Sequence, residues 1–199
     1  SLAAVGSTTA LINMFTNLFI GISLGANVLS ARFYAAGKDK EMSETVHTSI
    51  TLALISGIIM VFVGLIFAKP VLELMDTPDD VINLSTLYMR IYFMGMPFFM
   101  LYNYGAAILR AVGDTKRPLI FLIISGCINA VLNLFFVIVC SLGVAGVAIG
   151  TIVSQFVSCV LVLCCLCKAD TSYKLCFNKL AIDTCYWPLF EVVDGVYHI

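Results

Sequence analysis

The amino-acid sequence predicts an all-α protein, a polytopic membrane bundle of five transmembrane helices. Hydrophobic residues make up 61% of the 199-residue chain and charged residues only 12%, whereas a soluble domain has about 45–50% apolar and about 25% charged residues. The apolar residues form long runs, and a run of about 20 residues can cross a bilayer as a helix. Basic residues gather in alternate connections between these runs. Together these observations predict a protein that folds in lipid.

Five apolar runs are long enough to span a membrane, and short polar connections separate them. The first predicted span ends before a connection rich in charge and glycine. A Thr-Pro-Asp-Asp segment at residues 77–80 precedes the third span, and its proline and acidic residues favour the first turn of a helix. In chain order, the predicted spans are residues 8–31, 46–68, 85–108, 119–140 and 144–167.

The third predicted span contains two residues that disturb a helix. Gly95 and Pro97 lie near its middle, and we expect them to bend it. The span is also rich in aromatic and Met side chains, which can hold flat organic cations. For most of these side chains, packing or lipid contact is the better explanation. Tyr102 and Asn103 are the residues of this span that we predict to line a central cavity.

The connection at residues 109–118 reads Leu-Arg-Ala-Val-Gly-Asp-Thr-Lys-Arg-Pro. Gly113 is a typical helix stop, and either Asp114 or Thr115 can cap the helix that follows. Two apolar runs flank the segment, so we expect a tight turn at a membrane surface.

The distribution of basic residues predicts the orientation of the chain. Nine of the eleven Lys and Arg residues fall on one side of the predicted membrane, and by the positive-inside rule that side is cytoplasmic. We therefore predict a multi-pass protein of the cell (inner) membrane. Residues 1–168 form the bundle, and residues 169–199 form a cytoplasmic linker and an atypical tail. The nine residues are Arg32, Lys38, Lys40, Arg110, Lys116, Arg117, Lys168, Lys174 and Lys179.

Three pairs of polar residues lie four positions apart inside apolar runs, so each pair shares a helix face. Asn13 and Asn17 belong to a stripe in the first span, which predicts either close helix packing or a polar lining of a cavity. Polar groups at membrane depth usually point toward partners or water. The remaining pairs therefore predict either interhelical hydrogen bonds or a site for Na⁺ or a proton. They are Asn129 with Asn133, and Thr151 with Gln155, and we also predict that Gln155 lines the central cavity.

No enzyme signature occurs in the chain: it lacks the His-Glu-x-x-His, Gly-x-Ser-x-Gly and P-loop patterns. We therefore predict a protein that is not an enzyme, has no catalytic residue or organic cofactor, and does not bind nucleic acid.

Several short motifs resemble the MATE family, the multidrug and toxic compound extrusion transporters, and the match looks closest to the DinF-like branch. The connection at residues 109–118 is the most specific of them. The motifs also include Gly21-x-x-x-Gly25-Ala26, Ala31-Arg32, Ala35-Ala36-Gly37, Gly95-x-Pro97, Asn129-x-x-x-Asn133 and the segment from Gly143 to Gln155. Their predicted structural residues are Gly25, Arg32, Gly37, Pro97, Arg110, Gly113, Asp114 and Pro118.

The resemblance implies a twelve-helix transporter with two six-helix lobes around a central cavity. Such a protein exports amphipathic organic cations by alternating access, with Na⁺ or H⁺ as the coupling ion. The five predicted spans then correspond to the second to sixth helices, so the first helix and the second lobe are expected outside this chain. The family's cation or proton site maps onto Asn129, Asn133 and Thr151. Because Asn133 stands where the family has an aspartate, proton coupling through this position is not expected.

Two alternative functions remain open at this stage. The tail at residues 184–199 does not resemble the family, so the chain is alternatively a truncated membrane remnant that does not transport. The other alternative is a related flippase for lipid-linked precursors. Such flippases line their cavity with several basic residues, whereas here Arg90 alone lies within a predicted span.

Overall fold

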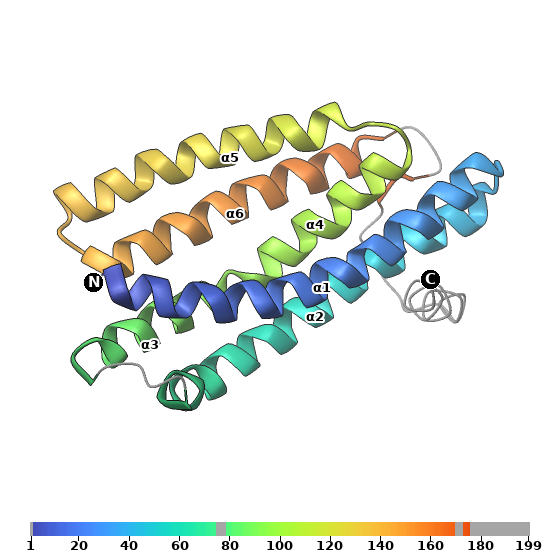
Figure 1. Ribbon diagram of the computed structural model, residues 1–199. Coiled ribbons are helices and arrows are strands. Elements are labelled where there is room, and N and C mark those ends of the chain that lie inside the picture. The colour runs from blue at the N-terminus through green and yellow to red at the C-terminus, as the bar shows by residue number, and fades with distance from the viewer. Residues whose placement is uncertain (1, 75–78, 170–172, 176–199) are drawn as a thin grey trace.

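The computed structural model describes residues 2–74, 79–169 and 173–175. The described residues form one helical bundle, shown in Figure 1. In chain order its elements are α1 (Leu2–Ala35), α2 (Asp39–Leu74), α3 (Asp79–Met94), α4 (Met96–Ala111), α5 (Lys116–Leu134), the π-helix η1 (Phe135–Val139) and α6 (Gly143–Cys167). The predicted all-α membrane fold is therefore confirmed.

Three helices in the described part of the chain are long and apolar enough to cross a membrane. They are α2, the continuous segment Lys116–Val139 formed by α5 and η1, and α6. The predicted first span lies within α1. The predicted third span is divided between α3 and α4, each of 16 residues. The count of five spans therefore stays a prediction.

The break between α3 and α4 occurs at the two residues that were expected to bend the third span. Gly95 lies between the two helices, and Pro97 falls in the first turn of α4. Proline suits this position because it has no backbone N–H to leave unpaired. The expected bend is therefore an interruption of the helix, and it lies in the interior of the bundle, since Gly95 and Met96 are both buried.

Helices α1, α2, α3, α4 and α6 form the core of the bundle, and α5 lies at its edge. In Figure 1, α4 packs against α1 and α2, whereas α5 runs beside α6. Two groups of buried side chains fill the core. One includes Met60, Phe93 and Tyr104, and the other includes Ile108 and Leu166 near the ends of α4 and α6. Helix α5 contributes little to either group, because only Pro118 and Ser125 of its residues are buried.

The turns after α1 and α4 share one geometry. Gly113 has a φ of +89°, and its N–H donates to the carbonyl of Arg110 at 3.0 Å, while the N–H of Asp114 donates to the carbonyl of Leu109 at 2.9 Å. This is the Schellman pattern of a helix end, which needs a residue in the left-handed region. Gly37, with a φ of +64°, ends α1 in the same way. The backbone N–H groups of Gly37 and Lys38 donate the two corresponding hydrogen bonds.

Asp114 provides the cap of α5, which decides between the two predicted residues. Its Oδ1 accepts the backbone N–H of Arg117 at 3.1 Å, and its Oδ2 lies 3.2 Å from the Arg117 Nε. Thr115 occupies the N-cap position but makes no side-chain capping bond.

The left-handed conformation at Gly113 gives a first testable prediction. Gly113→Val is expected to destabilise the chain by about 1–2 kcal/mol, because a left-handed backbone is costly for residues with a Cβ and most costly when they are β-branched. Gly113→Asn is the matched control and should lose much less, since Asn tolerates this region. Unfolding in mixed micelles, followed by the helical circular dichroism signal, measures both variants. Equal losses in the two would contradict the proposed cause.

Candidate functional site

The candidate site lies between α5 and α6, where small residues let the two helices approach closely. Gly146, Gly150 and Ser154 recur every four residues along α6 and are all buried. A Cβ on Gly146 would lie 2.8 Å from the Cβ of Phe136, and a Cβ on Gly150 would overlap the Oδ1 of Asn133. Stripes of small residues serve this purpose in membrane helices. The polar side chains of α5 are thereby brought within bonding distance of α6.

A chain of hydrogen bonds connects the predicted site residues. The Asn133 Nδ2 donates to the Asn129 Oδ1 at 3.0 Å, within one face of α5. The Asn129 Nδ2 in turn reaches α6, where it lies 3.3 Å from the Thr151 Oγ1 and 3.2 Å from the Ser154 Oγ. The two hydroxyls donate to carbonyls of their own helix, those of Val147 and Thr151. The structure therefore brings Asn129, Asn133 and Thr151 together, and their role as an ion site stays a prediction.

One acceptor in this chain of bonds has no partner. The Asn133 Oδ1 is buried and accepts no hydrogen bond from the described residues. A carbonyl oxygen in this position costs about 1–3 kcal/mol unless a donor or a cation satisfies it. The site thus presents an unpartnered oxygen beside Gly150, next to the hydrogen bonds that connect Asn133, Asn129 and Thr151.

The backbone changes immediately after Asn133. Residues Phe135–Val139 form the π-helix η1, a rare form that occurs often at functional sites. The aromatic rings of Phe135 and Phe136 contact each other there, with their centroids 5.6 Å apart.

The side chains of the site offer uncharged oxygen atoms as possible ligands for a cation. They are two amides and two hydroxyls, and none of them titrates near neutral pH. Such a site can bind a cation through oxygen atoms, but its own side chains cannot carry a proton. In the described part of the chain, no three His, Cys, Asp or Glu residues are grouped as they would be to hold a metal ion.

Gln155 was predicted to share a face with Thr151, but it serves a different contact. Its Oε1 is buried without a hydrogen-bond partner among the described residues. It lies against the break between α3 and α4, since a Cβ on Gly95 would be 2.7 Å from it. Gln155 therefore faces the interrupted helix and takes no part in the bonds that join α5 to α6.

The other residues predicted to line a cavity lie outside this cluster. Asn13 and Asn17 are exposed on α1. Asn103 is half-buried and donates to the carbonyl of Phe99 within α4 at 2.8 Å. Tyr102 is buried, and its hydroxyl donates to the carbonyl of Pro118 at 3.0 Å, which connects α4 to the start of α5. Their role in a cavity stays a prediction.

The predicted motif residues occupy helix ends and close contacts. Gly25 is buried in α1, and Arg32 and Arg110 lie exposed in the last turns of α1 and α4. Pro97 packs against Gly57 of α2: a Cβ added to Gly57 would lie only 2.5 Å from the Pro97 Cα.

Ser154 and Gly150 also belong to this cluster, although they were not predicted from the sequence to do so. Ser154 accepts a hydrogen bond from Asn129, and Gly150 leaves room for the Asn133 amide. The sequence feature that could have indicated these two residues is the four-residue spacing of small residues along α6. That spacing becomes meaningful only when the neighbouring helix is known.

Comparison with known proteins identifies the family. The MatE family model matches residues 1–135. The probable multidrug resistance protein YoeA of Bacillus subtilis (strain 168) is 33% identical over 183 residues, which are 90% of this chain and 39% of that protein. The FAD transporter of Shewanella oneidensis is 25% identical over 162 residues, which are 79% of this chain and 36% of that protein. The chain thus spans about two fifths of the length of YoeA.

A solved structure shows the same fold. An inward-facing multidrug resistance MATE transporter of the MOP superfamily superposes with a TM-score of 0.88 at 23% identity, over 98% of this chain and 44% of that one. Members of the family are transporters rather than enzymes, and homologues of this chain are named as multidrug export proteins. With a family-model match over most of its length and an apolar helical bundle of the same fold, this chain is an integral membrane protein of the MatE family.

Proposed function

We propose that this chain provides one lobe of a cation-coupled antiporter that exports amphipathic organic cations by alternating access. The observation that carries the proposal is the buried, unpartnered Oδ1 of Asn133 within the cluster of Asn129 and Thr151. Polar groups this deep in a membrane protein commonly mark an ion pathway. The partial coverage of the relatives fits a lobe that works together with a second one.

We propose Na⁺ as the ion bound at this cluster, and not a proton. The donors present are amide and hydroxyl oxygens, which suit a hard cation. A proton carrier at this place would need a carboxylate or an imidazole, and the side chains of the cluster include neither. In transporters, Na⁺ sites of this kind lie near the membrane midplane, where the protein supplies oxygen ligands.

Binding of Na⁺ to the isolated chain provides the first test. Sodium chloride is expected to raise the unfolding midpoint of the purified chain above that in choline chloride at equal ionic strength, because a ligand of the native state stabilises it. Asn133→Leu removes the unpartnered oxygen and should abolish this difference. Ser125→Ala is the control on the same helix, since its hydroxyl donates to the carbonyl of Leu122 within α5. A sodium effect that survives in Asn133→Leu would count against the site.

Transport is tested in a chimera. Residues 1–168 of this chain would replace the matching segment of the Bacillus subtilis relative, and the product would be reconstituted into vesicles. We expect an inward Na⁺ gradient to drive export of a cationic dye such as ethidium. The proposal fails if the chimera inserts normally but exports no cationic dye. Efflux by the 199-residue chain alone would contradict the requirement for a second lobe.

A further inference from the structure

A basic groove lies at the surface where α4 ends and α5 begins, at the end of the bundle opposite to η1. Its volume is about 320 Å³, and its lining includes Tyr102, Arg110, Thr115, Lys116, Leu119 and Leu122. The hydrogen bond from Tyr102 to the carbonyl of Pro118 holds its two walls together. The groove is therefore built by the same turn that connects the two helices.

The two cations of the groove lack acidic partners. Arg110 and Lys116 are exposed and form no ion pair within the described part of the chain. The one acidic residue of the turn, Asp114, is occupied by Arg117 at 3.2 Å. The groove consequently has an excess of positive charge, with the Thr115 side chain beside it.

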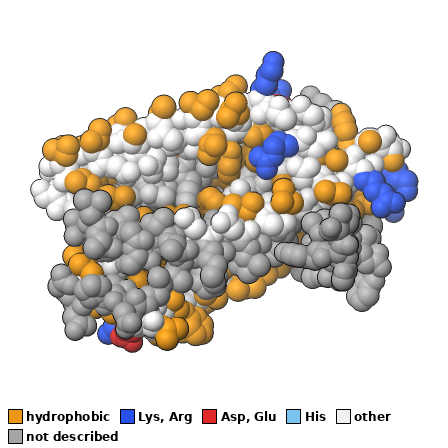
Figure 2. All heavy atoms as spheres, viewed as in Figure 1, with side chains coloured by type: hydrophobic (Ala, Val, Ile, Leu, Met, Phe, Trp, Pro, Cys, Tyr) orange, Lys and Arg blue, Asp and Glu red, His pale blue; other side chains and the backbone are white. Residues whose placement is uncertain are grey.

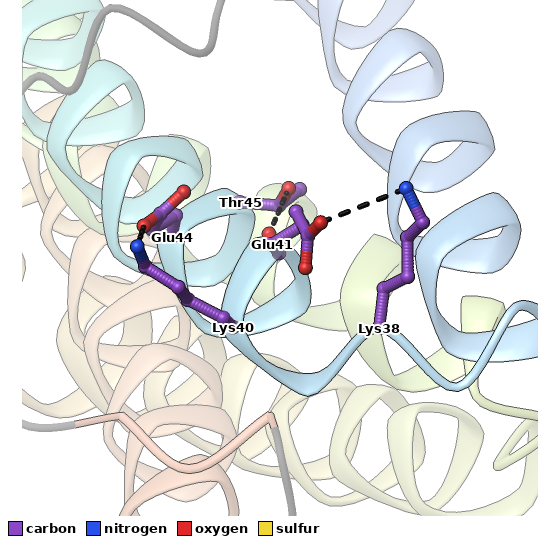
Figure 3. A network of polar contacts seen from close by, with 5 residues as sticks. All are labelled: Lys38, Lys40, Glu41, Glu44 and Thr45. Carbon is purple, nitrogen blue, oxygen red and sulfur yellow. Dashed lines mark hydrogen bonds and ion pairs between the residues drawn. The ribbon is translucent and has the colours of Figure 1, made fainter.

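The neighbouring connection shows a different arrangement. In Figure 3, Lys38, just before α2, points toward Glu41, and Lys40, in the first turn of α2, points toward Glu44. The two ion pairs measure 3.6 and 3.9 Å. These two lysines are paired with acids of the chain itself. The two cations that line the groove, in contrast, have no such acidic partner in the described part of the chain and can contact an external anion.

Apolar side chains adjoin the charged end of the groove. Leu119 and Leu122 lie one turn apart on α5 and are 57% and 53% exposed. They begin the apolar surface of a helix that is long enough to cross the membrane. Figure 2 shows hydrophobic side chains close to groups of Lys and Arg in the same view. A ligand that fits must therefore combine a negative head with an apolar tail.

We propose that this groove binds an anionic phospholipid of the cytoplasmic leaflet. Arg110 and Lys116 contact the phosphodiester, and Leu119 and Leu122 contact an acyl chain. The basic residues of the chain place this end on the cytoplasmic side, where anionic lipids attract clusters of Lys and Arg. The proposal is independent of the cation cluster, which involves other residues.

Short-chain lipids test the proposal directly. Purified chain in neutral detergent is titrated with dioctanoyl phosphatidylglycerol, dioctanoyl phosphatidylcholine or glycerol phosphate, and binding is measured by thermophoresis. We expect binding of phosphatidylglycerol that weakens with added salt, and little binding of the other two. Equal binding of phosphatidylcholine, or of glycerol phosphate without the acyl chains, would overturn the proposal. So would the absence of phosphatidylglycerol binding.

Charge-removing variants locate the site. Arg110→Gln and Lys116→Gln should each weaken phosphatidylglycerol binding about five-fold, and the double variant about 25-fold. Lys38→Gln with Lys40→Gln is the matched control: it removes the same charge from the same side of the membrane, but from lysines that are already paired. An equal loss in this control would show general charge attraction and would refute the groove. If the double variant does not fold, the single variants and the lipid comparison on the unchanged chain still decide.

Discussion

Asn133→Asp is expected to make Na⁺ binding by this chain strongly dependent on pH. The substitution keeps the size of the side chain but turns the unpartnered amide oxygen into part of a carboxyl group. A carboxylate binds a cation only after losing its proton, so Na⁺ and H⁺ would compete for one site. Below the titration of this carboxyl, the apparent Na⁺ affinity should fall by about tenfold per pH unit. The unchanged chain should bind Na⁺ equally well from acid to neutral pH, since no side chain of its cluster titrates there.

Binding of radioactive Na⁺ to the purified chain at a series of pH values measures this effect. Asn83→Asp is the matched control, because it makes the same chemical change at an exposed position of α3. Its Na⁺ binding should follow that of the unchanged chain at every pH. A flat pH profile for Asn133→Asp would show that Asn133 is not a ligand, and the proposed cation site would then be wrong.

The cluster around Asn129 was predictable because its geometry is mostly local. Residues four apart lie on one face of a helix whatever the helix packs against. Asn129 and Asn133 therefore had to be neighbours, and their depth in an apolar run required polar partners. Thr151 was the nearest suitable group on the next predicted span, across a three-residue connection. A short connection makes consecutive helices antiparallel neighbours, and the α5–α6 contact follows from that.

Contacts between helices that are distant in the sequence were not predictable in the same way. Gln155 is four residues from Thr151, so the two share a helix face, yet the Gln155 Oε1 lies against Gly95. Which helix the Gln155 side chain contacts depends on the rotation of α6 about its axis and on the position of the α3–α4 break beside α6. Hydropathy does not encode either quantity, because lipid-facing and protein-facing sides of a membrane helix are both apolar.

Two copies of the tripeptide Ile-Ser-Gly illustrate this limit. One ends at Gly57 in α2 and the other at Gly126 in α5, and each lies within an apolar run. Gly57 is buried, and a Cβ there would lie 2.5 Å from the Pro97 Cα, whereas a Cβ on Gly126 would meet nothing within 4 Å. The local sequences are the same, but the packing partners differ.

Gly57→Ala and Gly126→Ala are therefore expected to change stability in opposite directions. Gly57→Ala should destabilise the chain by about 2 kcal/mol, because the added methyl group meets the backbone of α4, and overpacking of this kind costs about 1–3 kcal/mol. Gly126→Ala should stabilise it by up to about 1 kcal/mol, the difference in helix propensity between the two residues.

Unfolding of both variants in mixed micelles, with the free energy compared at one detergent composition, measures the difference. Both substitutions add one methyl group after the same Ile-Ser pair, so propensity and hydrophobicity change alike. Any difference in sign must then come from the contact of α2 with Pro97. If the two variants shift stability equally, Pro97 does not lie against Gly57, and the packing of the interrupted helix on α2 would need to be different.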